Sequence, residues 1–135
     1  QHIAYKNWVL TGNNIRCNGN IENILDYETV ANGGHPNMAE SCFYGMFFDW
    51  SGLITAPALP ATTLAYGCYK AMFCNCTGLS TAPELPATRL ASYCYNGMFL
   101  KCASLRNTPI LPATTLADVT KSKILFINMH FLLLR

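Results

Sequence analysis

Three consecutive stretches of 26 residues decide the fold: they read CFYGMFFDWSGLITAPALPATTLAYG at residues 42–67, CYKAMFCNCTGLSTAPELPATRLASY at 68–93 and CYNGMFLKCASLRNTPILPATTLADV at 94–119. Eleven of the 26 columns are identical in all three, so the stretches are copies of one structural unit. A fixed period of about 20–50 residues is typical of solenoids, propellers and arrays, because each unit is too small to bury its own apolar face. The sequence therefore predicts that function lies on a repeated surface and not in a single catalytic pocket.

One half of the unit is predicted to be a short helix. Leu90, Cys94, Met98 and Cys102 recur every four residues. This spacing indicates one apolar face of a helix over about residues 89–100.

The other half of the unit, residues 79–86 in the second copy, is expected to be extended. It contains Pro83 and Pro86, and two prolines three positions apart exclude a helix. Proline also removes a backbone donor, so any strand ladder should be short and interrupted. Because neighbouring strands lie about 4.8 Å apart whereas packed helices need about 8–10 Å, stacking should curve the array. The expected fold is an α/β solenoid with short parallel strands on the concave side and short helices on the convex side.

Two atypical segments flank the three repeats at 42–119. Residues 1–41 lie outside the period and are expected to form an N-terminal cap. Residues 120–135 keep part of the pattern, which indicates a degenerate fourth repeat or C-terminal cap, with an altered end of a longer array as the alternative. The chain opens without Met or an export signal, so we expect a processed protein or an excerpt.

Composition excludes several classes of function. Charged residues make up 12% of the chain and the net charge is +2, without a basic run, so nothing predicts nucleic-acid binding. The longest apolar run, residues 124–134, is shorter than the about 20 residues of a membrane span. We therefore expect neither a nucleic-acid partner nor a membrane span.

Five of the seven cysteines occupy two repeat columns: Cys42, Cys68 and Cys94 in one, and Cys76 and Cys102 in the other. Trp50 occupies the second column in the first copy, so that position accepts a bulky apolar side chain. This favours buried thiols over required disulfides. Disulfides stay open as an alternative, with pairing between neighbouring copies geometrically easier than pairing within one.

Nothing in the sequence predicts catalysis, a cofactor or a metal. Cys68, Cys74 and Cys76 lack a histidine or second cysteine pair at zinc spacing. His2, His35 and His130 lie outside the repeats, and no Ser or Cys has the context of an activated nucleophile. Asp26 and Glu28, two positions apart, are more typical of solvated carboxylates than of a catalytic pair. We expect a protein that is not an enzyme.

The pattern Phe-x-x-Cys-x-x-Leu occurs at Phe73, Cys76 and Leu79 and again at Phe99, Cys102 and Leu105. Together with the extended stretch ending in Leu-Pro and the run at 90–99, it resembles BspA-type leucine-rich repeats. The resemblance covers about residues 40–119, with a somewhat longer unit than is usual in that family. It implies a leucine-rich-repeat-like right-handed solenoid, export to the surface of a host-associated bacterium, and adhesion to host or bacterial surface proteins.

Columns that differ between copies need not serve the shared core, so they indicate solvent-exposed positions. On the extended stretch these candidates for a concave binding face are Ile54, Thr55, Ala58, Ser80, Thr81, Glu84, Arg106, Asn107 and Ile110. Lys70 and Asn96 vary in the same way on the predicted helix. The alternative is that all of these are merely tolerant surface positions.

The sequence thus favours a non-enzymatic module that binds a protein ligand at the cell surface or outside the cell. One alternative is a spacer or stalk in which the repeats set length and have no ligand of their own. Another is an enzyme that uses a thiol, which would require a cysteine with a lowered pKa.

Overall fold

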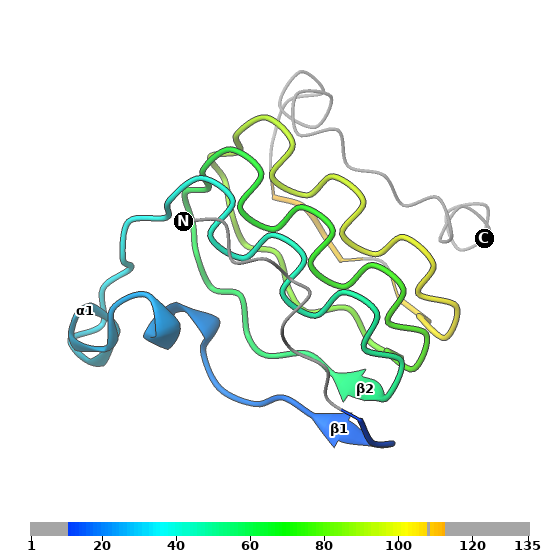
Figure 1. Ribbon diagram of the computed structural model, residues 1–135. Helices are drawn as coiled ribbons and strands as arrows, with labels where there is room; N and C mark the ends of the chain where they lie inside the picture. Colours follow the sequence, from blue (N-terminus) through cyan, green and yellow to red (C-terminus); the bar gives the residue numbers. More distant parts are fainter. Residues whose placement is uncertain (1–10, 108, 113–135) are drawn as a thin grey trace.

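The computed structural model describes residues 11–107 and 109–112, and within them few residues form regular secondary structure. The strands are β1 (Ile15–Arg16) and β2 (Leu53–Thr55), and the helices are the 3-10 helix η1 (Ile21–Ile24) and α1 (Tyr27–Ala31). β1 and β2 pair in parallel, with Ile15 opposite Leu53. The three repeats run alongside one another, and most of their backbone forms turns and extended segments (Figure 1).

One side of every repeat is a series of overlapping turns at residues 40–49, 66–75 and 92–101, which we call the turn side. Within it, an N–H donates to the carbonyl three positions earlier, as Met72 N does to Tyr69 O at 3.2 Å. Every fourth residue has a positive φ, between 52° and 64°. An α-helix requires a negative φ throughout. The predicted helix over residues 89–100 is therefore wrong.

The four-residue spacing explains this error. Two overlapping turns use four residues, and over a dozen residues an α-helix with 3.6 residues per turn gives nearly the same apolar pattern. Hydrogen bonds between copies favour the turns. Every second N–H of the turn side donates to a carbonyl of the next copy, as Tyr69 N does to Cys94 O and Phe73 N to Met98 O, each at 3.0 Å. A helix would use these N–H groups internally, whereas the turns use them to join successive repeats.

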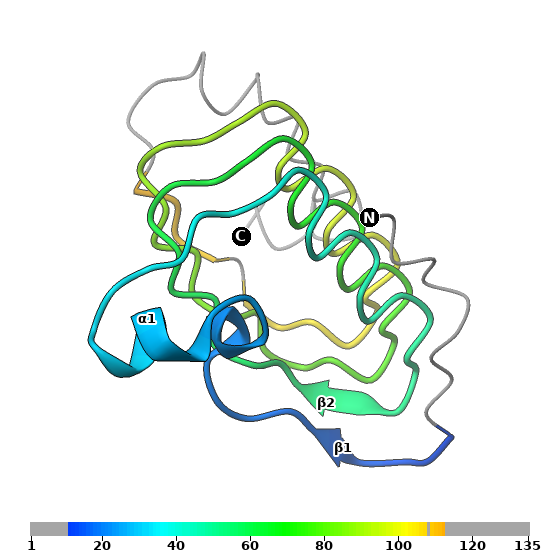
Figure 2. The same cartoon turned by 60° about the vertical axis from the view of Figure 1, so that its left-hand side comes forward.

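The core consists of columns of similar side chains that stack from one copy to the next. Phe47, Phe73 and Phe99 form one column, with ring centroids 5.3 and 5.7 Å apart and nearly parallel planes. Phe43, Tyr69 and Tyr95 form a second, with centroids 5.9 and 6.1 Å apart. In Figure 2 the turn side and the extended segments lie on different sides of this interior. Stacking like on like explains why the core columns change so little between copies.

All seven cysteines are free thiols, and those of the repeat columns belong to the core, as predicted. Cys68, Cys76, Cys94 and Cys102 are buried and Cys42 is half-buried. The Sγ of Cys76 donates to the carbonyl of Phe47 at 2.9 Å, and the Sγ of Cys102 to that of Phe73 at 3.0 Å. Trp50, in the same column of the first copy, packs edge-on against the Phe47 ring. The disulfide alternative is not supported.

The extended segments make few backbone hydrogen bonds to one another. Among the described residues of the three copies, a strand occurs in the first copy alone: it is β2, and its partner is β1 of the N-terminal segment. Between the second and third copies, Arg106 N donates to Ser80 O at 3.0 Å and Ala82 N donates to the side chain of Asn107 at 2.8 Å. The prediction of an interrupted ladder agrees with this. The right-handed, leucine-rich-repeat-like solenoid with strands on a concave side stays a prediction.

The N-terminal segment lies against the first repeat through β1 and through Ala58. Ala58 N donates to Gly19 O at 2.8 Å, and Ala58 O accepts from Ile21 N at 3.1 Å. Farther along, α1 projects away from the repeats (Figure 1). The carboxylate of Asp26 caps α1 by accepting the N–H and the hydroxyl of Thr29 at 3.1 and 2.6 Å, and these bonds lower the pKa of Asp26. Asp26 is therefore a helix cap.

That residues 1–41 form a cap stays a prediction. The expected fourth repeat or C-terminal cap at 120–135 lies outside the described residues, as do His2 and His130.

Candidate binding surfaces

The extended segments form a surface of their own, which we call the proline face. It consists of residues 54–60, 80–86, 106–107 and 109–112. One groove of about 340 Å³ lies between the first and second copies, and another of about 410 Å³ between the second and third. Their walls are the segments that contain Pro57, Pro60, Pro83, Pro86, Pro109 and Pro112. Because proline has no N–H, a continuous ladder cannot close the space between copies here. The prolines therefore open the grooves.

The structure brings four of the nine predicted binding residues to these grooves. Ala58 and Glu84 line the first, and Glu84, Asn107 and Ile110 line the second. Ile110 is 88% exposed, which is unusual for an isoleucine and gives the second groove an apolar wall.

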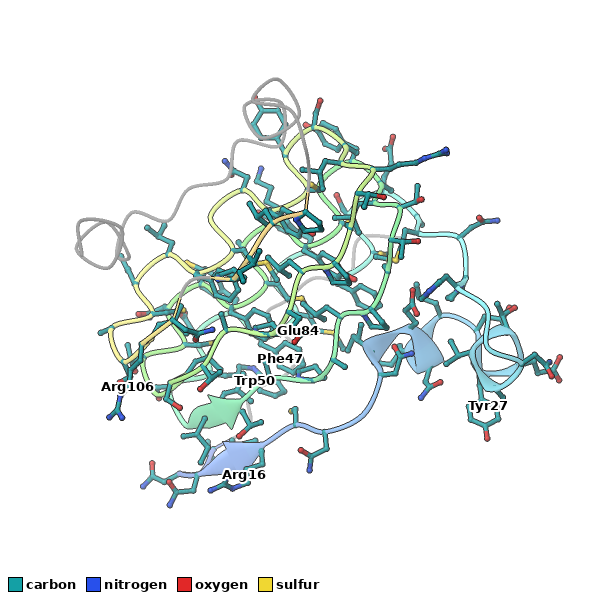
Figure 3. The ribbon with its side chains drawn as sticks, turned by 180° about the vertical axis from the view of Figure 1, so that it is seen from behind. Arg16, Tyr27, Phe47, Trp50, Glu84 and Arg106 are labelled. Carbon is teal, nitrogen blue, oxygen red and sulfur yellow. The ribbon has the colours of Figure 1, made fainter. Side chains whose placement is uncertain are left out.

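The other five predicted residues lie beside the grooves and do not line them. Ile54 and Thr55 belong to β2, and Ser80 is half-buried and accepts the N–H of Arg106. Thr81 and Arg106 are exposed. Figure 3 shows Arg106 at the edge of the repeats, extending away from them. The grooves therefore occupy only part of the predicted face.

Glu84 is the charged group shared by both grooves. It is exposed and lies on the segment that separates them. Within the part of the chain that the structure describes, the one ion pair joins His35 to Glu22, so the carboxylate of Glu84 has no cationic partner there. An exposed carboxylate between two proline-walled grooves can pair with a cationic group of a ligand.

A feature that the sequence did not reveal is the pairing of Glu22 with His35. Glu22 is completely buried, and its two carboxylate oxygens lie 3.1 and 2.9 Å from Nδ1 of His35. The nearby hydroxyl of Tyr69 is buried without a hydrogen-bond partner among the described residues. A buried carboxylate needs a hydrogen-bond partner, and His35 is the partner of Glu22. Thirteen positions separate Glu22 from His35, and no motif announces their contact.

His35 also lines a cleft of about 440 Å³ between the loop at 35–38 and residues 61–65 of the first repeat. A histidine held at Nδ1 by a carboxylate is oriented as in many active sites. The residues that line this cleft include Thr62 and Thr63 but no serine or cysteine. The Glu22–His35 contact joins two parts of the N-terminal segment.

Burial keeps the thiols of the repeat columns protonated. Burial raises the pKa of Cys42 and of Cys94 to about 11 and that of Cys102 to about 12. Burial also raises the pKa values of Cys68 and Cys76. Since the thiolate is the nucleophile, these five thiols are poor nucleophiles near neutral pH. Among the described residues, no three His, Cys, Asp or Glu side chains gather as a metal site.

A second surface feature, which we call the tyrosine–lysine cluster, lies on the turn side and consists of the half-buried residues Tyr44, Lys70 and Tyr93 and the exposed Tyr66. Lys70 Nζ lies over the rings of both Tyr44 and Tyr93, at 5.5 and 5.7 Å from their centroids. The ring of Tyr93 also lies 5.7 Å from that of Tyr66, which is 47% exposed. The cluster thus combines residues of the first and second copies.

Tyr93 occupies a backbone position that favours glycine. Its φ is +60°, and the same column holds Gly67 at +59° and Ser41 at +54°. A left-handed conformation costs a residue with a side chain about 1–2 kcal/mol. The ring of Tyr93 contacts Lys70 and Tyr66 from this position.

Comparisons of this chain with family models, with curated proteins and with solved structures give no match. Among the described residues, no helix has the length and apolar character needed to cross a membrane.

Proposed function

We propose that this chain is a non-enzymatic binding module that presents the proline face to a protein ligand. The observation that carries the proposal is the pair of grooves between successive repeats, whose walls are proline and leucine columns shared by all copies and which also include a few residues that differ from copy to copy. A constant core with variable residues at its grooves is the arrangement by which a repeat protein acquires specificity without changing its fold. The grooves are apolar with one central carboxylate, as in surfaces that bind extended peptides.

The resemblance to BspA-type repeats extends this proposal. On that basis the module belongs to a solenoid exported to the bacterial surface, where its ligand is a host extracellular protein or another bacterial surface protein. The free thiols fit this location only because most of them are buried, which shields them from oxidation.

The test is a binding screen of the purified chain against immobilised fibronectin, laminin and collagen, followed by variants of the proline face. Glu84→Gln and Ile110→Ser should each weaken a detected interaction by about tenfold, since each removes one groove contact. Glu40→Gln, which alters an exposed carboxylate outside the grooves, is the matched control and should change nothing. If Glu84→Gln and Ile110→Ser bind as well as the parent, the proline face is not the binding surface. Absence of binding to the whole panel would favour the spacer alternative.

A further inference from the structure

The tyrosine–lysine cluster lies on the turn side and shares no residue with the grooves of the proline face. Two features coincide in it: a lysine ammonium that lies over two rings, and an exposed third ring.

We infer that the tyrosine–lysine cluster is a second binding surface, which takes an aspartate or glutamate side chain of a peptide partner between two apolar neighbours. The ammonium of Lys70 has three donors, and no described carboxylate forms an ion pair with it. The Tyr44 and Tyr93 rings hold this ammonium in place, so less conformational entropy is lost when a carboxylate approaches. The exposed part of Tyr66 offers apolar contact to a neighbouring side chain of the peptide.

Other partners fit the cluster less well. A nucleic acid or phosphate group is held best by several cations or by the fork of an arginine, whereas the cluster contains a single lysine. A sugar would stack on an open aromatic face, but Lys70 already lies over the rings of Tyr44 and Tyr93. A single carboxylate flanked by apolar side chains matches both the charge and the rings.

The test uses the full chain and two blocked heptapeptides, Ac-Ala-Ala-Leu-Asp-Leu-Ala-Ala-NH₂ and the same peptide with Asn in place of Asp. Binding is followed by NMR through the tyrosine ring signals. The Asp peptide should bind about tenfold more tightly than the Asn peptide and should lose this advantage at high salt. Lys70→Met should reduce binding of the Asp peptide to that of the Asn peptide. Lys101→Met, which removes an exposed lysine of the turn side, is the matched control and should have no effect.

Tyr93→Gly separates recognition from folding. Glycine suits the positive φ at this position, so the variant should stay folded, as a thermal melt would show, while it loses most of the peptide affinity. Equal binding of the two peptides would overturn the inference, and so would full affinity in Lys70→Met. Saturable shifts of the same rings with cellohexaose but not with the Asp peptide would identify a sugar site in its place. Because the residues differ from those of the proline face, this result stands apart from the outcome of the Glu84 test.

Discussion

Replacing Ala71 by glycine should stabilise the protein, although the same change in a helix would destabilise it. Ala71 has a φ of +52°, and its column holds Gly45 at +61° and Gly97 at +62° in the other two copies. Alanine in the left-handed region costs about 1–2 kcal/mol. Glycine, however, gives the unfolded chain more freedom, which costs about 0.4–1 kcal/mol of stability. The difference is a net stabilisation of about 0.8 kcal/mol for Ala71→Gly, or about 3 °C in the thermal midpoint.

Gly97→Ala is the reciprocal change and isolates the backbone effect. A Cβ at Gly97 would meet no atom within 4 Å, so the alanine methyl adds no steric clash. The variant should lose about the same free energy that Ala71→Gly gains. Because Ala71 N donates to Asn96 O at 2.8 Å, the two positions are close enough to couple, and the double variant measures that coupling.

The assay is equilibrium unfolding in urea, followed by far-UV circular dichroism, with the slope of the transition compared between variants. The sign of the change discriminates between the two structures for this side of the repeat. In a helix interior, Ala→Gly lowers the free energy of unfolding by about 1 kcal/mol and Gly→Ala raises it by a similar amount. A less stable Ala71→Gly together with a more stable Gly97→Ala would refute the turn geometry.

Four further predictions concern other parts of the structure. Gly78→Ala should lower the free energy of unfolding by about 2 kcal/mol in the same urea assay, because a Cβ there would lie 2.5 Å from a backbone oxygen of the preceding copy. An unchanged unfolding midpoint would contradict this close approach. In native protein at pH 8, Cys42 and Cys94 should react with iodoacetamide far more slowly than in guanidinium, since a pKa of about 11 leaves about 0.1% thiolate. The same raised pKa values predict that the free energy of unfolding falls from pH 9 to 11, because thiols of the unfolded chain lose protons there that those of the folded chain retain. A free energy of unfolding that stays constant over this range would contradict the raised pKa values. His35→Ala should destabilise the protein by about 3 kcal/mol, because it leaves Glu22 buried without its partner. The double variant Glu22→Leu with His35→Leu should recover part of this loss, and thermal melts of both variants would show it.

The repeat period predicted which side chains form the core, because burial depends on chemical type and every copy must bury the same columns. Most described residues of the fixed Met and Leu columns and most of the column cysteines are buried as expected, whereas Met46, Leu90 and Leu111 are half-buried. The backbone of the turn side could not be predicted in this way. Serine, aspartate and tyrosine occupy positive-φ positions at Ser41, Asp49 and Tyr93, where a sequence pattern normally shows glycine or asparagine. Hydrogen bonds to the next copy impose this conformation, and no local sequence signal reports them.

The candidate sites also differ in how far the sequence could predict them. Variation between copies led to Glu84, Asn107 and Ile110, because variable columns point to solvent wherever the core is constant. It also marked Lys70, but it could not show that this lysine lies over the rings of Tyr44 and Tyr93. Glu22 and His35 occur outside the repeats, where there are no copies to compare, so no internal variation could mark them.

The two sides of the repeat differ in how the copies are joined, and this difference determines where a ligand could enter between copies. On the turn side, backbone hydrogen bonds link neighbouring copies at every second residue, so a ligand can reach only side chains. On the proline face, prolines remove the donors at fixed positions, and the copies separate enough to form grooves. A ligand of the proline face can therefore enter between the repeats, whereas a ligand of the turn side must bind on top of them. Longer arrays of this unit would add one groove per copy, so affinity for an extended ligand should grow with repeat number while the tyrosine–lysine cluster stays a single site.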